Sequence, residues 1–443
     1  MVKADKKINS ILPNLIINIK DINIGMILVS TYILIEIGSF RVFSIVDQLQ
    51  LPYLVSVLTF VYAIYLVLRG KFDFKSPLNK MLLVFCIYII VYAQIDMINT
   101  FYREGMSKLF IQYIANYIII VSSVKKPQQL IFMVDVFLFS VLHSSYHSIY
   151  QGGRIWSTLW LKGENNVGLL CAYAIPYAYF LYINYRDSVK KYFYLICMFA
   201  SVTGVIVANS RGGFVATAVI GFFCWLFVVK KIRVLFLLLA VSLLVAQFAP
   251  DSFFTELKSL EQGTEEGTAD ERVYSWGIAI KMFIDHPVLG VGPFNYSEYL
   301  YQYDNEAEGR FGGVGRVAHS TQFQWLAECG IVGLYILIYF QLQLYRNWKI
   351  IYHLKIPDET NRLKDAVFLK TMTHANLITQ IGFWVAAMFI SIIHYPFYWL
   401  LPAFSEVWKN IYIDYVNEKS EAQSDGSRLK VPNRPTLKNR PDY

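Results

Sequence analysis

Charged residues are scarce in this sequence. Only 16% of its 443 residues are Asp, Glu, Lys or Arg, whereas about 25% is usual for a soluble domain. Hydrophobic residues reach 56%, and apolar runs of roughly 17–25 residues recur along most of the chain. This composition excludes an ordinary soluble globular protein and predicts a helical protein that crosses the membrane many times.

Cysteines are also few, and none stands at a metal-ligand or redox spacing from another. All five lie singly in apolar segments, where a thiol usually acts as a small hydrophobic side chain. His143 and His147 have a spacing that metal ligands use, but no glutamate or third ligand accompanies them. We therefore expect no disulfide, no metal ion and no cofactor. The N-terminus lacks an apolar stretch followed by a cleavage site, so we expect no removable signal peptide.

The apolar pattern predicts an all-α integral membrane protein with about twelve transmembrane helices. The predicted spans are residues 22–40, 50–68, 78–96, 107–123, 129–149, 166–185, 191–209, 213–229, 232–249, 320–344, 373–394 and 396–412. Four regions follow from them: nine spans in residues 1–249, a long loop with short helices in 250–319, three spans in 320–412, and a polar tail in 413–443 that we expect to be disordered.

The distribution of Lys and Arg predicts the orientation. With a cytoplasmic N-terminus, 29 of the 40 Lys and Arg residues fall on the cytoplasmic side and 11 on the other. The net charge of +8 then reflects membrane orientation and does not indicate a nucleic-acid partner. Both termini become cytoplasmic and the long loop lies outside.

Within the long loop, a helix is predicted over 271–284, ended by Asp285-His286-Pro287 and followed by a tight turn at Gly290–Pro293. Residues 250–318 carry a net charge of −7, so this loop is not a diffuse anion-attracting surface. An anion site here would need individual, well-aimed arginines.

Two arginines on the outer side are candidates for such a site. Arg211 stands in Asn209-Ser210-Arg211-Gly212-Gly213, between two closely spaced spans, where its planar guanidinium could bind a phosphate oxyanion. It could equally be a membrane-surface anchor. Arg272 stands inside the loop helix and could either bind an anion or pair with a neighbouring acid.

His319 ends the long loop at the start of a predicted span. An imidazole there can accept a proton from a hydroxyl at the lipid–water boundary, or it can simply cap a helix end. On a continuous helix, Gly330 and Gly333 would share the face of His319 and allow a close helix contact. Glu328 would lie on the opposite face.

Three local patterns resemble the O-antigen ligase/polymerase superfamily, a group of bacterial membrane enzymes that includes protein O-oligosaccharyltransferases. The patterns are Ser210-Arg211-Gly212-Gly213, Arg272 to Trp276 followed by His286-Pro287-Val288-Leu289-Gly290-Val291-Gly292, and His319-Ser320 followed after nine residues by Gly330-x-x-Gly333. The likeness covers roughly residues 156–399.

The resemblance implies a metal-independent glycosyltransferase of the bacterial inner membrane with a periplasmic active site. Its donor would be a glycan on a polyprenyl diphosphate, and its acceptor a hydroxyl of lipid A core, protein or another glycan. Arg211, Arg272 and Arg316 would bind the diphosphate, and His319 would be the catalytic base. An aromatic outer rim that includes Trp156, Trp160 and Trp325 could stack sugars.

Several functions remain open on the sequence alone. A ligase, a polymerase of lipid-linked repeat units and a protein O-oligosaccharyltransferase share this chemistry and differ only in the acceptor. A polysaccharide transporter or flippase is the alternative from another class. It would favour paired charges in the membrane, for which Glu36 and Asp135 are candidates, and a repeated half that this chain does not show.

Overall fold

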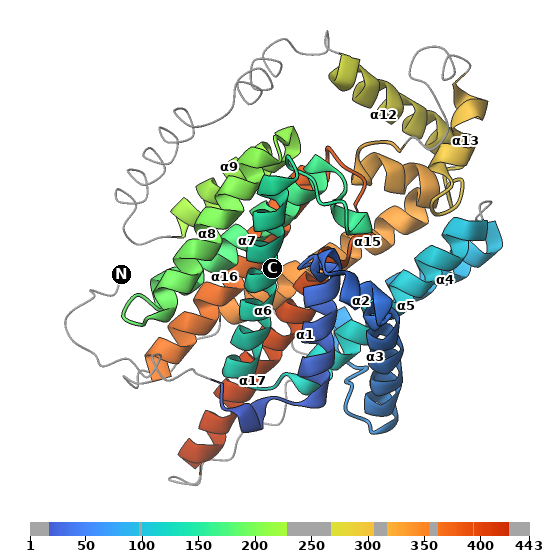
Figure 1. The fold of residues 1–443 in the computed structure, drawn as a ribbon. Coiled ribbons are helices and arrows are strands. Elements are labelled where there is room, and N and C mark those ends of the chain that lie inside the picture. Colours follow the sequence, from blue (N-terminus) through green and yellow to red (C-terminus); the bar gives the residue numbers. More distant parts are fainter. Residues whose placement is uncertain are drawn as a thin grey trace.

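The computed structural model describes residues 17–96, 100–227, 267–304, 317–353, 362–392 and 394–424. Every regular element in these ranges is helical, in agreement with the predicted all-α class (Figure 1). The long helices are α1 (Ile24–Glu36), α3 (Leu51–Leu68), α4 (Pro77–Asp96), α5 (Thr100–Ser123), α6 (Pro127–Tyr150), α7 (Glu164–Asn184), α8 (Lys190–Val207), α9 (Arg211–Leu226), α12 (Gly267–Asp285), α15 (Thr321–His353), α16 (Arg362–Ala386) and α17 (Leu400–Ser424). Shorter helices are η2 (Ile19–Asp21), η3 (Phe40–Val42), α2 (Ser44–Gln48), η4 (Leu159–Leu161), α13 (Tyr296–Tyr303) and η6 (Pro396–Trp399).

Local sequence signals account for several helix ends. Helices α4 and α6 begin at Pro77 and Pro127, positions where the missing N–H of proline has no intrahelical partner to lose. Asn23 caps α1 by accepting a hydrogen bond from the Met26 amide at 3.1 Å. Helix α12 ends at Asp285, ahead of Pro287 as the sequence predicted.

Helix α7 is the most buried part of the bundle among the candidate spans. In the apolar 18-residue stretch of α7, 83% of the residues are buried, whereas the figure for α3 is 22%. It packs against α6, α8, α9 and α16, and its buried side chains lie all around the helix, which is typical of a central helix. Helix α3 instead leaves Leu54, Phe60 and Leu68 exposed, as expected for a face in contact with lipid.

Five of the described helices are long and apolar enough to cross a membrane: α3, α6, α7, α8 and α15. The fold is therefore consistent with a membrane protein, while the count of twelve spans stays a prediction. The predicted span 232–249 lies outside the described residues.

The predicted boundaries near the C-terminus were wrong in two places. Helix α16 ends at Ala386, before the expected residue 394, and an irregular segment and η6 precede α17. Helix α17 continues to Ser424, so the first part of the tail 413–443 is helical although we expected disorder. Residues 425–443 lie outside the described residues.

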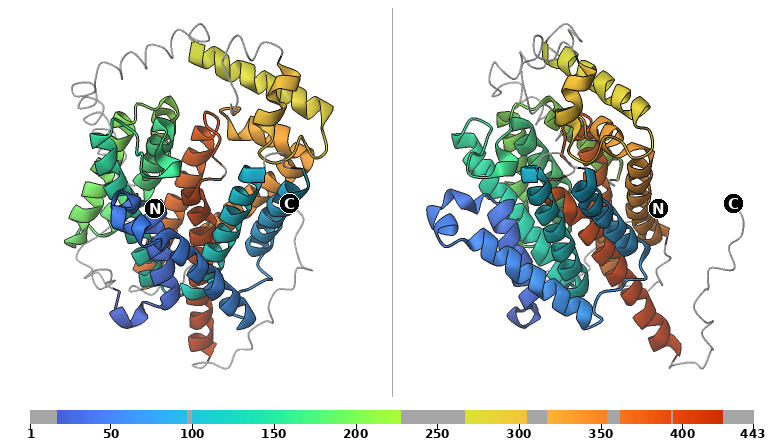
Figure 2. Two further views of the ribbon diagram at one scale, coloured as in Figure 1. Left: turned by 45° about the vertical axis from the view of Figure 1, so that its right-hand side comes forward. Right: turned by 90° about the vertical axis from the view of Figure 1, so that its right-hand side faces the viewer.

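Helices α12 and α13 lie together at one end of the bundle, beside the first turns of α15 (Figures 1 and 2). Their buried side chains form a small core separate from that of the bundle, which we call the loop core. Its members are Ile278, Ala279, Met282, Val291, Tyr296, Leu300, Ala318 and Ala327. The loop core therefore connects helices α12 and α13 of the long loop to Ala318, the residue that precedes His319.

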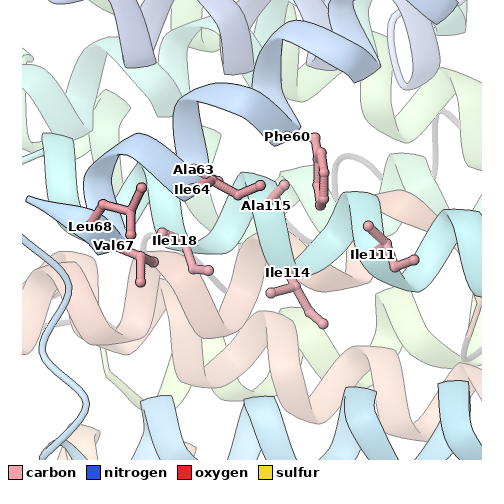
Figure 3. Close-up of a pocket in the computed structure, with 9 residues that line it drawn as sticks. All are labelled: Phe60, Ala63, Ile64, Val67, Leu68, Ile111, Ile114, Ala115 and Ile118. Atoms are coloured by element: carbon pink, nitrogen blue, oxygen red, sulfur yellow. The ribbon is translucent and has the colours of Figure 1, made fainter.

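An apolar groove runs between α3 and α5, with a volume of about 270 Å³. Phe60, Ala63, Ile64, Val67 and Leu68 of α3 face Ile111, Ile114, Ala115 and Ile118 of α5 across it (Figure 3). None of the residues that the sequence singled out for chemistry lines this groove.

Candidate functional site

Helix α15 is broken at Gly330, whose backbone angles (φ 57°, ψ −157°) are not helical. The loop segment 286–292 fills the break with four backbone hydrogen bonds. The amides of Val291 and Gly292 donate to the carbonyls of Ala327 and Glu328, each at 2.9 Å. Beyond the break, the amides of Ile331 and Val332 donate to the carbonyls of Pro287 and Val288, at 2.9 and 3.2 Å. The loop segment thus satisfies the backbone groups that the break would leave unpaired.

Two glycines make this close approach possible. A Cβ on Gly330 would stand 2.5 Å from the carbonyl oxygen of Val288. A Cβ on Gly290 would stand 2.4 Å from the carbonyl carbon of Glu328. Both glycines also have positive φ, which other residues rarely adopt. The sequence motifs around residues 286–292 and 319–333 are therefore one structural unit.

Two tyrosines of α4 support this unit from the side. Tyr92 donates its hydroxyl to the carbonyl of Leu289 at 2.7 Å, and Tyr88 donates to the carbonyl of Cys329 at 3.3 Å. These two hydrogen bonds hold the loop segment and the helix break against α4.

His319 lies just before α15, with an exposed side chain and a left-handed backbone (φ 51°). The preceding Ala318 is fully buried in the loop core, so the position of the His319 backbone is well anchored. The expectation that His319 shares a continuous helix face with Gly330 and Gly333 was wrong, because His319 is outside the helix and Gly330 interrupts it. Gly330 meets the loop segment, not a neighbouring helix.

The irregular segment 387–392 joins the start of α15 to α9. The Thr321 amide donates to the carbonyl of Ala387 at 2.8 Å, and the Thr321 hydroxyl donates to that of Ile390 at 2.6 Å. On its other side, Phe389 of this segment packs over Gly212, with 3.3 Å between its Cβ and the Cβ that Gly212 lacks. The chain positions that follow His319 and Arg211 therefore meet at one segment.

Arg211 is the first residue of α9, directly after a capping serine. The Ser210 hydroxyl accepts from the Gly213 amide at 3.1 Å and donates to Oδ1 of Asn165 at 2.7 Å. We expected the two glycines to admit a ligand, but Gly212 meets Phe389 and Gly213 meets Gly168 of α7. The small size of Gly212 thus makes room for segment 387–392, and that of Gly213 makes room for α7. The side chain of Arg211 lies outside the described residues.

Arg272 lies in the first half of α12 and is half-buried. One turn later, Trp276 stacks on Phe323 of α15, with ring centroids 4.9 Å apart and planes within 16°. Phe323 is one turn beyond His319, so this stack brings the Arg272 end of α12 to the His319 end of α15. Arg316 lies outside the described residues.

Glu328 is a buried carboxyl that the sequence interpretation set aside. It is 3% exposed and accepts hydrogen bonds from the amides of Tyr296, at 3.2 Å, and Phe294 and from the side chain of Gln324, at 2.8 Å. A glutamate inside an apolar run was the available signal, since a carboxyl is rarely fully buried unless it is paired.

A second missed element is the segment that follows residue 392. Tyr395 accepts a hydrogen bond from Nδ2 of Asn166, at the start of α7, at 2.8 Å. The ring of His394 lies against Trp160 and Phe294, and burial lowers its pKa to about 4. The imidazole of His394 is therefore neutral at physiological pH. Nothing in the apolar and aromatic sequence around His394 predicted this contact.

The predicted aromatic rim is only partly exposed. Trp156 is 59% exposed, but Trp160 is buried and Trp325 is buried against Phe85, at 5.3 Å between ring centroids. Trp160 and Trp325 are therefore packing residues, and the expectation that they form a sugar-facing rim was wrong for both.

The two predicted intramembrane acids are both paired. Glu36 forms an ion pair with Arg41 and accepts from Nε1 of Trp160 at 3.3 Å. Asp135 pairs with Lys190 at 3.2 Å and accepts from the Tyr194 hydroxyl at 2.9 Å. An ion pair of this kind is sufficient to explain why each of the two acids lies inside the bundle.

Residues 196–338 match the family model described as O-antigen ligase. This match supports assignment of the chain to the O-antigen ligase/polymerase superfamily. All three superfamily-like patterns lie inside the matched range, including the helix break and the 286–292 segment that fills it. The 387–395 segment lies outside it. A comparison with curated proteins gives no significant match.

Proposed function

We propose that this superfamily member transfers an oligosaccharide or polysaccharide from a polyprenyl diphosphate carrier to an acceptor hydroxyl. The observation that supports this most strongly is the meeting of the three patterns. Segment 286–292 is hydrogen-bonded into α15 across Gly330, and the starts of α15 and α9 both contact segment 387–392. Positions far apart in the chain thereby gather at one end of the bundle.

In this proposal His319 is the catalytic base. It accepts the proton of the acceptor hydroxyl as the oxygen bonds to the anomeric carbon of the donor sugar. The bond from that carbon to the diphosphate oxygen breaks, and the polyprenyl diphosphate leaves with the electron pair. Its growing negative charge would be stabilised by Arg211, Arg272 and Arg316, which can act in place of a metal ion.

The proposed site faces the periplasm of a bacterial inner membrane, with both chain termini in the cytoplasm. The excess of Lys and Arg on the opposite side supports this orientation. The membrane-spanning helices would leave the polyprenyl tail of the donor in lipid.

The acceptor is best tested with purified protein and a glycan on a polyprenyl diphosphate. Lipid A core, a pilin-like protein and a second lipid-linked unit are offered separately, because they distinguish a ligase, a protein O-oligosaccharyltransferase and a polymerase. We favour the ligase reaction and expect transfer to lipid A core in the presence of EDTA.

The same assay carries the site variants. His319→Ala should lower kcat by about 10²–10⁴-fold and Arg211→Ala by about 10²-fold, with both proteins folded and inserted. Full activity in both variants would remove the site assignment. Movement of intact donor across vesicles without any transfer would instead support the transporter alternative.

A further inference from the structure

We infer that Glu328 is a positioning residue that sets the place of Arg272 relative to His319. The inference rests on the proposed function for its kinetic consequence, but the contacts that carry it are independent of any substrate. Glu328 is the buried carboxyl directly before the break in α15, two residues ahead of Gly330.

The first contact connects Glu328 to α13. The amide of Tyr296, the first residue of α13, donates to Oε1 of Glu328 at 3.2 Å. The side chain of Asn295, the residue before α13, makes no capping hydrogen bond there and donates instead to the carbonyl of Val291 at 2.9 Å. Glu328 thus supplies the acceptor that a helix start requires.

The second contact connects α13 to α12. The hydroxyl of the same Tyr296 donates to the carbonyl of Ser275 on α12 at 2.8 Å. Tyr296 is almost fully buried in the loop core, so it forms a rigid bridge from Glu328 to α12. Arg272 is three residues before Ser275 on that helix.

The third contact holds Glu328 to its own helix. Gln324, one turn earlier in α15, donates to the same oxygen at 2.8 Å, and His319 precedes that turn. A single buried carboxyl therefore joins the helix that begins after His319 to the helix that carries Arg272. Loss of this contact would leave α12 held to α15 by the Trp276–Phe323 stack without the bridge through Tyr296. The two groups would then shift relative to each other, and a displacement of about 1 Å between catalytic groups can lower a rate about 100-fold.

The kinetic test compares Glu328→Ala with Glu328→Gln. The glutamine keeps an oxygen that can accept from Tyr296, so it should retain most of the activity. Glu328→Ala should lower kcat by about 100-fold with little change in KM for the donor. Tyr296→Phe, which removes only the bond to Ser275, should show a smaller loss in the same direction.

A double-mutant cycle separates positioning from general destabilisation. If Glu328 acts through Arg272, then Glu328→Ala together with Arg272→Ala should be no slower than the slower single variant. The matched control is Glu406→Gln, which alters another buried carboxyl with three donors, Ser76, Asn347 and Lys409. It should lower Tm yet leave kcat of the folded protein unchanged. Additive losses, or an equal loss of kcat in Glu406→Gln, would overturn the inference.

Hydrogen exchange gives a readout that needs no substrate. In Glu328→Ala, the amides of Phe294 and Tyr296 should exchange about tenfold faster or more, and Glu328→Gln should restore slow exchange. Unchanged exchange would overturn the positioning role even if the protein is active. If exchange responds as expected but wild type transfers no glycan, the proposed function fails and the joint between the helices remains.

Discussion

Left-handed backbone is concentrated at the candidate site. Among the described residues, five that are not glycine have positive φ, and three of them are Asn209, Phe294 and His319. Asn209 precedes the cap of α9, Phe294 follows the segment that fills the helix break, and His319 precedes α15. Such conformations are held in place only where the surroundings fix them, and they gather at functional sites.

The neutral state of His394 predicts a pH dependence of stability. Its pKa is about 4 in the folded protein and about 6.5 when unfolded. The unfolded state therefore binds more protons between these values, so stability falls as pH is lowered from 6.5 to 4. Above pH 6.5 this histidine contributes no pH dependence.

The variant His394→Phe removes this titration and keeps a ring against Trp160 and Phe294. We expect its Tm in detergent, relative to wild type, to rise steadily as pH falls from 6.5 to 4. Thermal unfolding measured by intrinsic fluorescence at several pH values checks this. A difference in Tm that stays constant over the range would contradict the neutral, buried imidazole.

Among the helices, the break in α15 accounts for two glycine-containing motifs of this chain. The motif around Gly290 and the motif around Gly330 contact each other at the break. The loop segment 286–292 supplies hydrogen bonds on both sides of Gly330, so this part of the long loop is bonded into a candidate membrane-spanning helix. Segment 286–292, attached in this way, has little freedom to move independently of α15.

The glycine at the break gives a direct test of this arrangement. Gly330→Ala adds a Cβ at 2.5 Å from a backbone oxygen and at φ 57°, so we expect a loss of stability of about 1–3 kcal/mol or more and a loss of transfer. Gly277→Ala is the matched control because its Cβ meets nothing within 4 Å on helix α12. Alanine there should be neutral or stabilise by up to about 1 kcal/mol. Equal Tm values for the two variants would contradict the account.

Sequence periodicity predicted the helices well because apolar runs and prolines are local signals. The start of α15 and the end of α12 at Asp285 followed from them. The break at Gly330 did not, because its cause is segment 286–292, which is distant in sequence. The role of Glu328 was missed for the same reason, since its donors Phe294 and Tyr296 belong to another element.

In the candidate site too, some residues could be predicted from local sequence patterns and others depend on contacts between distant parts of the chain. Sequence patterns singled out His319, Arg211 and Arg272, and the structure brings the chain around the first two to segment 387–392. That segment itself was predicted to be the end of the span 373–394. Its place depends on contacts with Thr321 and Gly212, which no local pattern encodes.

At the scale of the whole molecule, the Lys and Arg distribution predicts that both termini are cytoplasmic. Protease-cleavable tags at the two termini should be protected in sealed right-side-out vesicles and cleaved in inverted ones. A tag inserted in the long loop should show the opposite pattern. Cleavage of one terminal tag in right-side-out vesicles would mean an odd number of spans and would place the proposed site differently.

The proposed role of His319 as the base in glycan transfer can be tested with a single variant. Asparagine tolerates the left-handed backbone at this position better than most residues, so His319→Asn should keep the wild-type Tm. With a polyprenyl diphosphate-linked glycan and lipid A core, it should lower kcat by about 10²–10⁴-fold, whereas His353→Asn, at the far end of α15, should transfer at the wild-type rate. Wild-type kcat in folded His319→Asn would contradict the account.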